Sequence, residues 1–483
     1  MFKKILCLVL ALFVCVSLAA CGDTNDDVSE TTADVTASPE NEAGLPTANY
    51  GGYEFHILSV GRGTVCTDDF AYSEENASIL DAAVHKRNMS VEALYNVKLD
   101  TEWRNTTANQ QSPEGYRALV QEATAGDTNY DLCVIPGYDV SELAYGGYLT
   151  DLNKLPYFDS TATWYDQKAN ETFDFGGSLF FTAGDYGINL MDQTYCIAFN
   201  KKLAEEYGVE DLYDLVRTNK WTLEKMYEIA KSVSSDTDGD GTNDVYGNLY
   251  WVDSIYGALN AAGQKLVTLN DDNLTYELSA NNEVTNDVLR DFYDMVMNEQ
   301  VSLKYQHNST SKEYVNIFSG DQALFFLTTI GTLGEFRDME TDYGILPYFL
   351  YSETQTEYAN TVAPFYMNYM CVPLVVENYD RTSAVMEAIG YYSEQIIIPA
   401  YYEKTLTGQY VRDTESSDML DIIFETRAYD LGYCYQPAWL NKHLIYMLNE
   451  GNFDWTSRYA SLEVSAQATL DVISYSYRAA IGK

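Results

Sequence analysis

The stretch YDLCVIPG, residues 130–137, decides the fold class of this chain. It is a continuous apolar run that ends in Pro-Gly, which is typical of a central parallel strand buried on both faces. Upstream, YEFHILSV (53–60) predicts another strand, and residues 78–96 carry apolar side chains at helical spacing before a short strand at 97–99. Strands that alternate with helices predict an α/β fold with a parallel sheet.

The same alternation continues further along the chain. GSLFFTAGD (177–185) and TYCIAFN (194–200) are apolar runs that predict two more strands. KWTLEKMYEIAKSVSS (220–235) predicts a helix with Thr222 as its N-cap. ALFFLTTIG (323–331) predicts another buried strand, so the α/β pattern extends over most of the chain.

Size and charge limit the possible functions. The chain has 483 residues, of which 46% are hydrophobic and 14% aromatic, so it exceeds the size at which one core normally suffices, and two domains are expected. Its formal net charge is -43, from 29 Lys and Arg against 72 Asp and Glu. Because such a surface repels phosphate groups, neither nucleic acid nor an anionic membrane surface is an expected partner of the folded part.

The first residues predict export and anchoring. MFKKILCLVLALFVCVSLAAC has a basic start, a short apolar run and a small-residue exit, which is the order of a secretory signal peptide. Its end, LAAC, resembles the lipobox of bacterial lipoproteins, so we expect residues 1–20 to be removed and Cys21 to carry lipid. Residues 21–49 are polar and acidic, which predicts a disordered tether at the outer face of the cell membrane. The alternative is an uncleaved anchor or a buried first helix.

Motifs of the common catalytic sites are absent from the sequence. It contains no G-x-S-x-G, no H-E-x-x-H, no phosphate-binding loop and no dinucleotide-binding glycine motif. The four histidines are far apart, and the five cysteines beyond Cys21 lack the close spacing of a zinc site or a disulfide framework. A pair of catalytic carboxylates could still be hidden among the 72 acidic residues, so a secreted glycoside hydrolase remains an alternative.

Several longer stretches, in this order, resemble one family. They include YDLCVIPGYDVSELAYGGYLTDLNKLPYF (130–158), GSLFFTAGDYGINLMDQTYCIAFNKKLAEEYG (177–208) and FSGDQALFFLTTIG (318–331). The chain is similar to the bacterial extracellular solute-binding lipoproteins of ABC importers, in particular the carbohydrate-type family 1. The resemblance covers nearly the whole chain beyond the tether.

The resemblance implies a type II periplasmic-binding-protein fold, in which two α/β lobes close on a hinge over a ligand. By that pattern, residues 50–188 and 342–398 form the first lobe, and residues 189–341 and 399–483 form the second. It also implies a small-molecule carbohydrate ligand and the transmembrane subunits of an ABC permease as partners, with the receptor itself a monomer.

Candidate ligand residues lie where the predicted strands end, because an open α/β sheet binds its ligand beyond the carboxyl ends of its strands. A sugar site needs aromatic faces and planar polar groups that pair the hydroxyls. The candidates are Tyr138, Asp139, Asp185, Tyr186, Asp192, Gln193, Tyr250, Trp251, Glu335, Phe336, Phe365 and Tyr366. Any one aromatic residue could instead lie in the core, and Asp192 could cap a helix. Trp221 and Trp439 are assigned to packing.

The loop DTDGDGTNDVYG (236–247) has the ligand order of a calcium loop. The predicted metal ligands are Asp236, Asp238, Asp240, Thr242 and Asp244, and Gly241 stands at the turn position. Position twelve departs from the pattern, because Gly247 stands there instead of a bidentate Glu. A structural calcium that acts as a clip is therefore expected, and a plain solvated turn is the alternative.

These observations predict a lipid-anchored receptor that captures a carbohydrate, expected to be an oligosaccharide, and hands it to a membrane permease without chemical change. A receptor of the same fold for peptides is a further alternative, since the sequence does not define the pocket. An adhesin would be expected to show repeats or β-rich patterning, and neither is visible.

Overall fold

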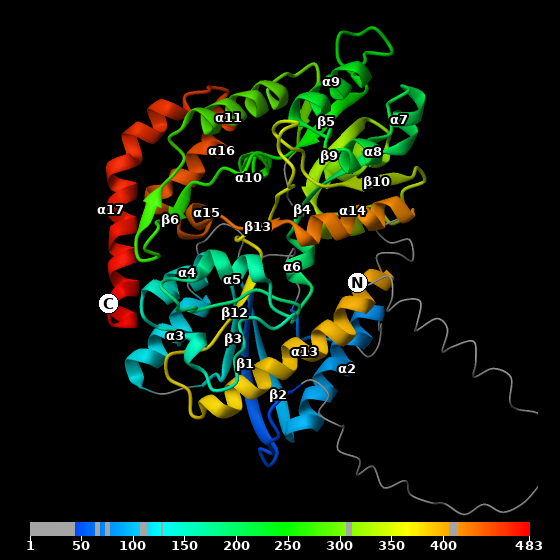
Figure 1. Ribbon diagram of the computed structural model, residues 1–483. Coiled ribbons are helices and arrows are strands. Elements are labelled where there is room, and N and C mark those ends of the chain that lie inside the picture. The colour runs from blue at the N-terminus through cyan, green and yellow to red at the C-terminus, as the bar shows by residue number, and fades with distance from the viewer. Residues whose placement is uncertain are drawn as a thin grey trace, which may run out of the picture. The chain divides into compact units, whose positions relative to one another are not determined.

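The computed structural model describes residues 44–62, 68–72, 78–106, 114–126, 129–305, 312–404 and 413–483. The predicted signal peptide, Cys21 and most of the predicted tether lie outside these ranges. Residues 41–483 form one compact unit (Figure 1). Among the described residues, no helix combines the length and the apolar character that a membrane span requires.

The first sheet confirms the α/β prediction. Its strands are β1 (Tyr53–Arg62), β2 (Val97–Thr106), β3 (Leu132–Pro136) and β12 (Asn368–Cys371). The order is β12-β3-β1-β2, with β1 parallel to β2 and β3, and β12 antiparallel to β3. Every residue of β3 is buried, as the apolar run predicts. Strand β2 extends well beyond the predicted residues 97–99.

Helices cover this sheet. They are α2 (Ile79–Tyr95), α3 (Glu114–Ala125), α4 (Gly137–Tyr145), α5 (Gln167–Phe173) and α13 (Tyr379–Lys404). Figure 1 shows α13 beside α2, and these two helices pack on each other. Helix α2 begins at a capping box, in which the Ser78 hydroxyl accepts from the Asp81 backbone and the Asp81 carboxylate accepts from the Ser78 backbone. Helix α4 starts directly at the carboxyl end of β3, which positions its first turn beyond the sheet edge.

The second sheet has five strands in the order β10-β4-β9-β5-β8. They are β4 (Tyr195–Asn200), β5 (Tyr246–Tyr250), β8 (Ser302–Lys304), β9 (Ala323–Thr329) and β10 (Tyr343–Leu346). Strand β9 is antiparallel to β4 and parallel to β5, so this sheet is mixed. The predicted strands at 194–200 and 323–331 are confirmed. The prediction for 177–185 is wrong, because this buried stretch makes only isolated single-residue bridges, for example from Thr182 to Met370.

The remaining elements surround the second sheet and join the two sheets. They are α6 (Asn189–Asp192), α7 (Lys201–Glu206), α8 (Leu212–Arg217), α9 (Leu223–Val233), α10 (Ser254–Ala261), β6 (Val267–Leu269), β7 (Tyr276–Leu278), α11 (Glu283–Val296), α12 (Glu313–Ser319), β11 (Asn360–Thr361), α14 (Thr414–Glu425), β13 (Arg427–Ala428), α15 (Leu431–Tyr435), α16 (Leu440–Glu450) and α17 (Trp455–Ile481), with short 3-10 turns at Leu152–Lys154, Ile330–Phe336 and Pro437–Trp439. The predicted N-cap of α9 is confirmed, since the Thr222 hydroxyl accepts from the Lys225 backbone at 3.1 Å. Strands β6 and β7 form a hairpin, and β11 pairs with β13.

The chain returns to the first sheet later than predicted. Strand β10 falls inside the range 342–398 that was assigned to the first lobe, but it pairs with β4 of the second sheet, with Tyr343 opposite Asn200. Strand β12 is the next element that joins the first sheet. The predicted crossover at residue 342 is therefore wrong, because the apolar run of β10 completes the second sheet. The rest of the division into lobes stays a prediction.

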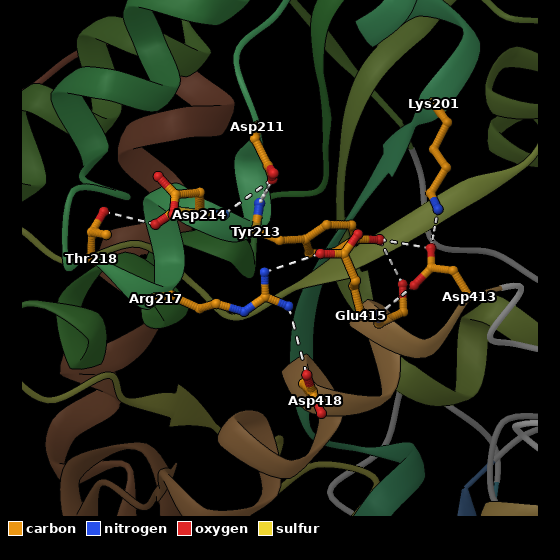
Figure 2. A network of polar contacts seen from close by, with 10 residues as sticks. Lys201, Asp211, Tyr213, Asp214, Arg217, Thr218, Asp413, Glu415 and Asp418 are labelled. Atoms are coloured by element: carbon orange, nitrogen blue, oxygen red, sulfur yellow. Dashed lines mark hydrogen bonds and ion pairs between the residues drawn. The ribbon is translucent and has the colours of Figure 1, made fainter.

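A polar network docks α14 on α7 and α8 (Figure 2). The Asp413 carboxylate pairs with Lys201 and accepts from the Tyr213 hydroxyl at 2.9 Å. Arg217 binds Glu415 at 3.0 Å and lies 3.6 Å from Asp418. Burial opposes ionisation of Asp413, but its hydrogen bonds with Lys201 and the Ser416 backbone outweigh it, so the pKa of this carboxyl lies below its usual value. This network fixes the chain just before it enters β13 and α15.

Candidate functional site

A group of seven side chains from both parts of the molecule meets between the two sheets. We call this group the aromatic cluster. It consists of Tyr138, Tyr195, Trp251, Asp253, Tyr256, Phe365 and Tyr433. Its members come from α4, β4, the end of β5, α10, the segment before β12 and α15. The site is thus assembled from residues that are almost three hundred positions apart in the sequence.

Tyr138 is the cluster member that lies at the carboxyl end of the first sheet. It stands in the first turn of α4, directly beyond β3, and its ring centroid lies 5.5 Å from Phe365 and 6.1 Å from Tyr433, both in edge contacts. The preceding Gly137 donates its N–H to the Pro364 carbonyl at 2.9 Å. A Cβ atom at Gly137 would lie 2.7 Å from that oxygen, so the close approach of the two segments requires glycine here.

The second sheet contributes the facing rings. Trp251 follows β5 directly and meets Tyr195 of β4 edge-on at 5.1 Å between centroids. Tyr256 of α10 stacks on Tyr433 of α15 at 3.8 Å, and its hydroxyl donates to the Asn441 carbonyl at 2.9 Å. These four residues are almost fully buried, because only 1% to 8% of the surface of each residue is exposed.

Asp253 places a carboxyl group among these rings. It is the residue before α10, but its side chain makes no capping hydrogen bond to that helix. Burial raises the pKa of Asp253 to about 6, although hydrogen bonds with Trp251 and Tyr433 and the charge of Lys442 favour the ionised form. The residue as a whole is only partly buried, although its carboxyl group is desolvated.

Gln193 supplies an acceptor near the same region. Its backbone carbonyl accepts from the Ala363 N–H at 3.0 Å, which fixes it next to the segment that carries Phe365. The residue is 1% exposed, and its side-chain Oε1 has no hydrogen-bond partner among the described residues. An unpaired buried acceptor costs about 1 to 3 kcal/mol, so a donor from a bound molecule would relieve this cost.

This arrangement suits the binding of a polyol. Aromatic faces cover the C–H surface of a sugar ring, and carboxylate and amide oxygens accept hydrogen bonds from its hydroxyls. The aromatic cluster offers both kinds of group in one place, between the two sheets.

The comparisons with known proteins agree with this geometry. Residues 74–363, more than half of the chain, match the family model of the bacterial extracellular solute-binding proteins. The chain belongs to this family. No curated protein matches it in sequence.

Solved structures with low sequence identity share the fold of this solute-binding protein. An ABC substrate-binding protein of Listeria monocytogenes in complex with cycloalternan is 15% identical, with a TM-score of 0.53 over 89% of this chain and 99% of that chain. The galacto-N-biose-/lacto-N-biose I-binding protein of Bifidobacterium longum is 12% identical, with a TM-score of 0.56 over 88% and 98%. A solute-binding protein of Thermotoga lettingae bound with α-D-tagatose is 14% identical, with a TM-score of 0.53 over 87% and 100%. These similarities show the two-lobed binding-protein fold.

The structure brings together some of the predicted ligand residues of this solute-binding protein. Tyr138, Trp251 and Phe365 belong to the aromatic cluster, and Tyr366 adjoins it through an edge contact with Phe365 at 4.6 Å. Gln193 lies beside the same segment.

Four predicted residues lie elsewhere, so the twelve candidates do not form one site. The Tyr250 hydroxyl points to the Met297 sulfur at 3.8 Å, because neighbouring residues of a strand face opposite sides. Glu335 pairs with Lys312 at 2.5 Å on the surface. Phe336 is 1% exposed and packs against Phe318, Phe326 and Tyr343 in the core. The Tyr186 hydroxyl donates to the Asn368 carbonyl at 2.6 Å.

The remaining predicted acids have other neighbours. Asp192 accepts from the Tyr401 hydroxyl at 2.7 Å and so ties α6 to α13. Burial raises the pKa of Asp185 to about 7, although the charge of Arg427 lowers it. Asp139 is buried in the first turn of α4, next to Tyr138.

Sequence reasoning missed four members of the aromatic cluster. They are Tyr195, Asp253, Tyr256 and Tyr433. Asp253 and Tyr256 follow the end of β5, which is a position where ligand residues are expected, so a longer search beyond that strand would have included them. Tyr433 carries no such signal, because only the tertiary fold brings α15 to the site.

The two tryptophans assigned to packing behave differently. Trp221 is fully buried and donates its indole N–H to the Pro347 carbonyl at 3.0 Å, which confirms the assignment. Trp439 is 43% exposed, so its assignment to packing is wrong. It has a φ of 62°, a left-handed conformation that is costly for a residue with a side chain, and the Lys442 ammonium lies 3.8 Å from its ring.

The acidic loop gathers three of its four predicted carboxylate ligands. Carboxylate oxygens of Asp236, Asp238 and Asp244 all lie within 4.8 Å of one another, whereas Asp240 is not part of this group. Gly247, at the twelfth position, packs against the backbone of Ala230, and a Cβ there would lie 2.4 Å from the Ala230 carbonyl. The packing of β5 on α9 therefore leaves no room for a bidentate Glu at this position.

The loop is closed by its own backbone. Asp236 accepts from the N–H groups of Gly241 at 2.8 Å and Gly239 at 2.7 Å. These two hydrogen bonds lower the pKa of Asp236, and hydrogen bonds from the Thr237 hydroxyl and N–H lower the pKa of Asp244. Both carboxylates are therefore ionised at neutral pH, the form that a calcium ion requires.

Proposed function

We propose that this chain is the substrate-binding component of an ABC importer that captures a carbohydrate between its two lobes and delivers it to a membrane permease. The aromatic cluster carries this proposal, because it joins aromatic faces to a carboxyl group at the boundary of the two sheets. Membership of the solute-binding family supports the transport role.

An oligosaccharide is the expected ligand class. The cluster joins six rings from α4, β4, α10, α15, the end of β5 and the segment before β12, which is a wider group than one sugar ring requires. The exposed Trp439 provides a further ring. Its face is covered by Lys442, and the charge of Lys442 also acts on Asp253 of the cluster. The named ligands of two similar structures, cycloalternan and lacto-N-biose, are themselves oligosaccharides.

The site is expected to bind and not to react. A glycoside hydrolase uses two carboxyl groups on either side of the bond that it cleaves. The aromatic cluster as defined contains one, Asp253. Ligand binding would instead favour the closed arrangement of the two lobes, which the permease then recognises.

The rest of the proposal concerns anchoring and stability. We expect lipid on Cys21 to hold the receptor at the outer face of the cell membrane and the receptor to act as a monomer. The acidic loop would hold a structural calcium through Asp236, Asp238 and Asp244, with further ligands from backbone oxygens or water.

Binding assays with a matched pair of variants test the proposal. The purified protein is screened by thermal unfolding against glycans and short peptides, and hits are measured by calorimetry. We expect one glycan class to raise the unfolding midpoint, Trp251→Ala to abolish that rise and Tyr250→Ala, one position away but outside the cluster, to retain it. A response to peptides alone would overturn the carbohydrate assignment, and release of shortened glycan products would show an enzyme.

A further inference from the structure

A second aromatic group, separate from the aromatic cluster, joins the two lobes at the C-terminal helix. We call it the latch. It consists of Phe175 and Phe180, which precede the segment bridged to β12, and of Tyr276, Tyr435 and Tyr477, which stand on β7, α15 and α17. In Figure 1, α17 runs from the side of α11 to the side of α4, and it contacts both β7 and α4.

The rings of the latch are in direct contact across the lobe boundary. Phe175 stacks on Tyr477 at 5.1 Å between centroids and lies 5.2 Å from Tyr276. Phe180 lies 5.2 Å from Tyr477. Phe175 and Tyr276 are fully buried, so these contacts exclude water.

The three phenols of the second lobe pair with one another. The hydroxyl oxygens of Tyr435 and Tyr477 are 2.8 Å apart, and those of Tyr276 and Tyr435 are 3.4 Å apart. Because these polar groups are paired within one lobe, the face that they present to Phe175 is apolar. Such a face can be separated from the two phenylalanine rings and re-formed without breaking a hydrogen bond of the three phenols.

A polar contact lies beside the rings. The Lys483 ammonium donates to the Gly176 carbonyl at 2.9 Å. Gly176 has a φ of 62°, and a Cβ there would lie 2.6 Å from Leu274, so this turn needs glycine to approach the second lobe.

The latch and the ligand site are linked through two helices. Helix α4 carries Tyr138 of the aromatic cluster in its first turn and ends with Tyr145, which contacts the latch, and α15 carries both Tyr433 of the cluster and Tyr435 of the latch. Tyr138 meets Tyr433 at 6.1 Å, and Tyr145 meets Tyr435 at 6.3 Å. A motion that separates α4 from α15 to open the site must therefore also separate the latch.

We infer that the latch holds the two lobes closed and controls how fast a captured ligand is released. This inference rests on the proposed function as a two-lobed receptor. By this inference the latch contacts are lost when the lobes open, so the latch contributes affinity without touching the ligand. A weaker latch would shift the population towards the open form and shorten the lifetime of the complex.

Small-angle X-ray scattering tests the latch without any ligand. We compare the purified protein with Phe175→Ala, and with Tyr475→Ala as the control, because Tyr475 lies on the same helix α17 but is 69% exposed. Phe175→Ala should increase the radius of gyration of the ligand-free protein, and Tyr475→Ala should not. Circular dichroism verifies folding, and Phe175→Leu replaces Phe175→Ala if the latter does not fold. Equal radii for folded variant and wild type would overturn the inference.

Ligand release gives the second test. With a glycan that binds the wild type, Phe175→Ala should raise the dissociation rate constant about tenfold, which is the effect of losing one aromatic contact. Tyr477→Phe, which keeps the ring, should change this rate constant much less. An unchanged rate constant in Phe175→Ala would contradict the latch. If no glycan binds the wild type, the proposed function fails, and the scattering result still decides whether the latch holds the lobes.

Discussion

The aromatic cluster and the acidic loop are built in opposite ways. The loop is made of nine consecutive positions whose carboxylates are held by backbone N–H groups of the same turn. The cluster joins residues from position 138 to position 433, and its one carboxyl group is surrounded by aromatic rings. The two regions also differ in electrostatics, because burial raises the pKa of Asp253 to about 6, whereas hydrogen bonds lower the pKa of Asp236. Residues close together in sequence therefore form an ionised loop, whereas residues far apart in sequence surround an acid whose pKa is raised by burial.

The largest expected effect is the loss of glycan affinity when the aromatic cluster is mutated while the acidic loop is left intact. Trp251→Ala should weaken glycan binding by about 30-fold or more, because a buried tryptophan at the centre of a site is a typical hot spot worth at least about 2 kcal/mol. The effect of a chelator on thermal unfolding should be unchanged in this variant. Calorimetry and thermal unfolding provide the two readings. Wild-type glycan affinity in the folded variant would show that the ligand binds elsewhere.

Removal of calcium should give the complementary result. If the ion is present at about a hundred times its dissociation constant, chelation lowers the stability of the wild type by ~2.7 kcal/mol. Asp236→Asn should abolish this difference, because Asp236 is one of the three gathered carboxylates, while Asp240→Asn, outside that group, should retain most of it. Glycan affinity should persist in both variants. The calcium proposal fails if the chelator leaves the unfolding midpoint of the wild type unchanged.

As the pH falls, glycan affinity at the cluster should decrease at a higher pH than calcium binding by the loop. Because the folded pKa of Asp253 is raised above its usual 3.8 to about 6, the stability that this group contributes is present below 3.8 and is lost as pH rises through 6. Ligand binding has the opposite sign, since hydroxyl donors prefer the ionised carboxylate. Between pH 7 and pH 5, we expect glycan affinity to fall by about one order of magnitude, or ~1.4 kcal/mol.

Calorimetry at a series of pH values measures this change. Asp253→Asn serves as the control, because it should remove the pH dependence in this range. The calcium effect should persist at pH 5, since the pKa values of Asp236 and Asp244 lie below the usual range and stability from these groups is lost only as pH falls through them. An affinity that rises on acidification would show that the protonated acid is the binding form.

The smallest expected effect concerns the docking of α14, which precedes the site residue Tyr433. Lys201→Met removes the partner of Asp413 and should lower the free energy of unfolding by about 1 kcal/mol, because the pair is half-buried. Arg217→Met, whose partners are exposed, should change it by less. Urea denaturation measures both. Equal losses in the two variants would contradict the importance assigned to the half-buried pair.

The positions of several strands along the chain could be predicted from sequence where burial is continuous. The runs at 130–137, 194–200 and 323–331 became central strands, because few other structures bury an apolar run of that length. The run at 177–185 is also apolar and mostly buried, but it makes only isolated bridges and joins neither sheet. Composition alone does not distinguish these two cases.

The site could be predicted only in part. Tyr138 and Trp251 were found because each directly follows a strand, and the rule for ligand residues in α/β sheets applies to such positions. The same rule selected Phe336, which lies in the core, and Tyr250, which faces the other side of its strand. Tyr433 was missed because its place depends on how the last hundred residues fold back over both sheets.

Hydrogen exchange with and without the best-binding glycan is the most direct test of the account. We expect slower exchange in α4, α10 and α15, which carry the aromatic cluster and the latch, and unchanged exchange in the acidic loop. Protection confined to other parts of the protein, or the absence of any glycan that produces protection, would contradict the claim that a carbohydrate closes the two lobes at the aromatic cluster.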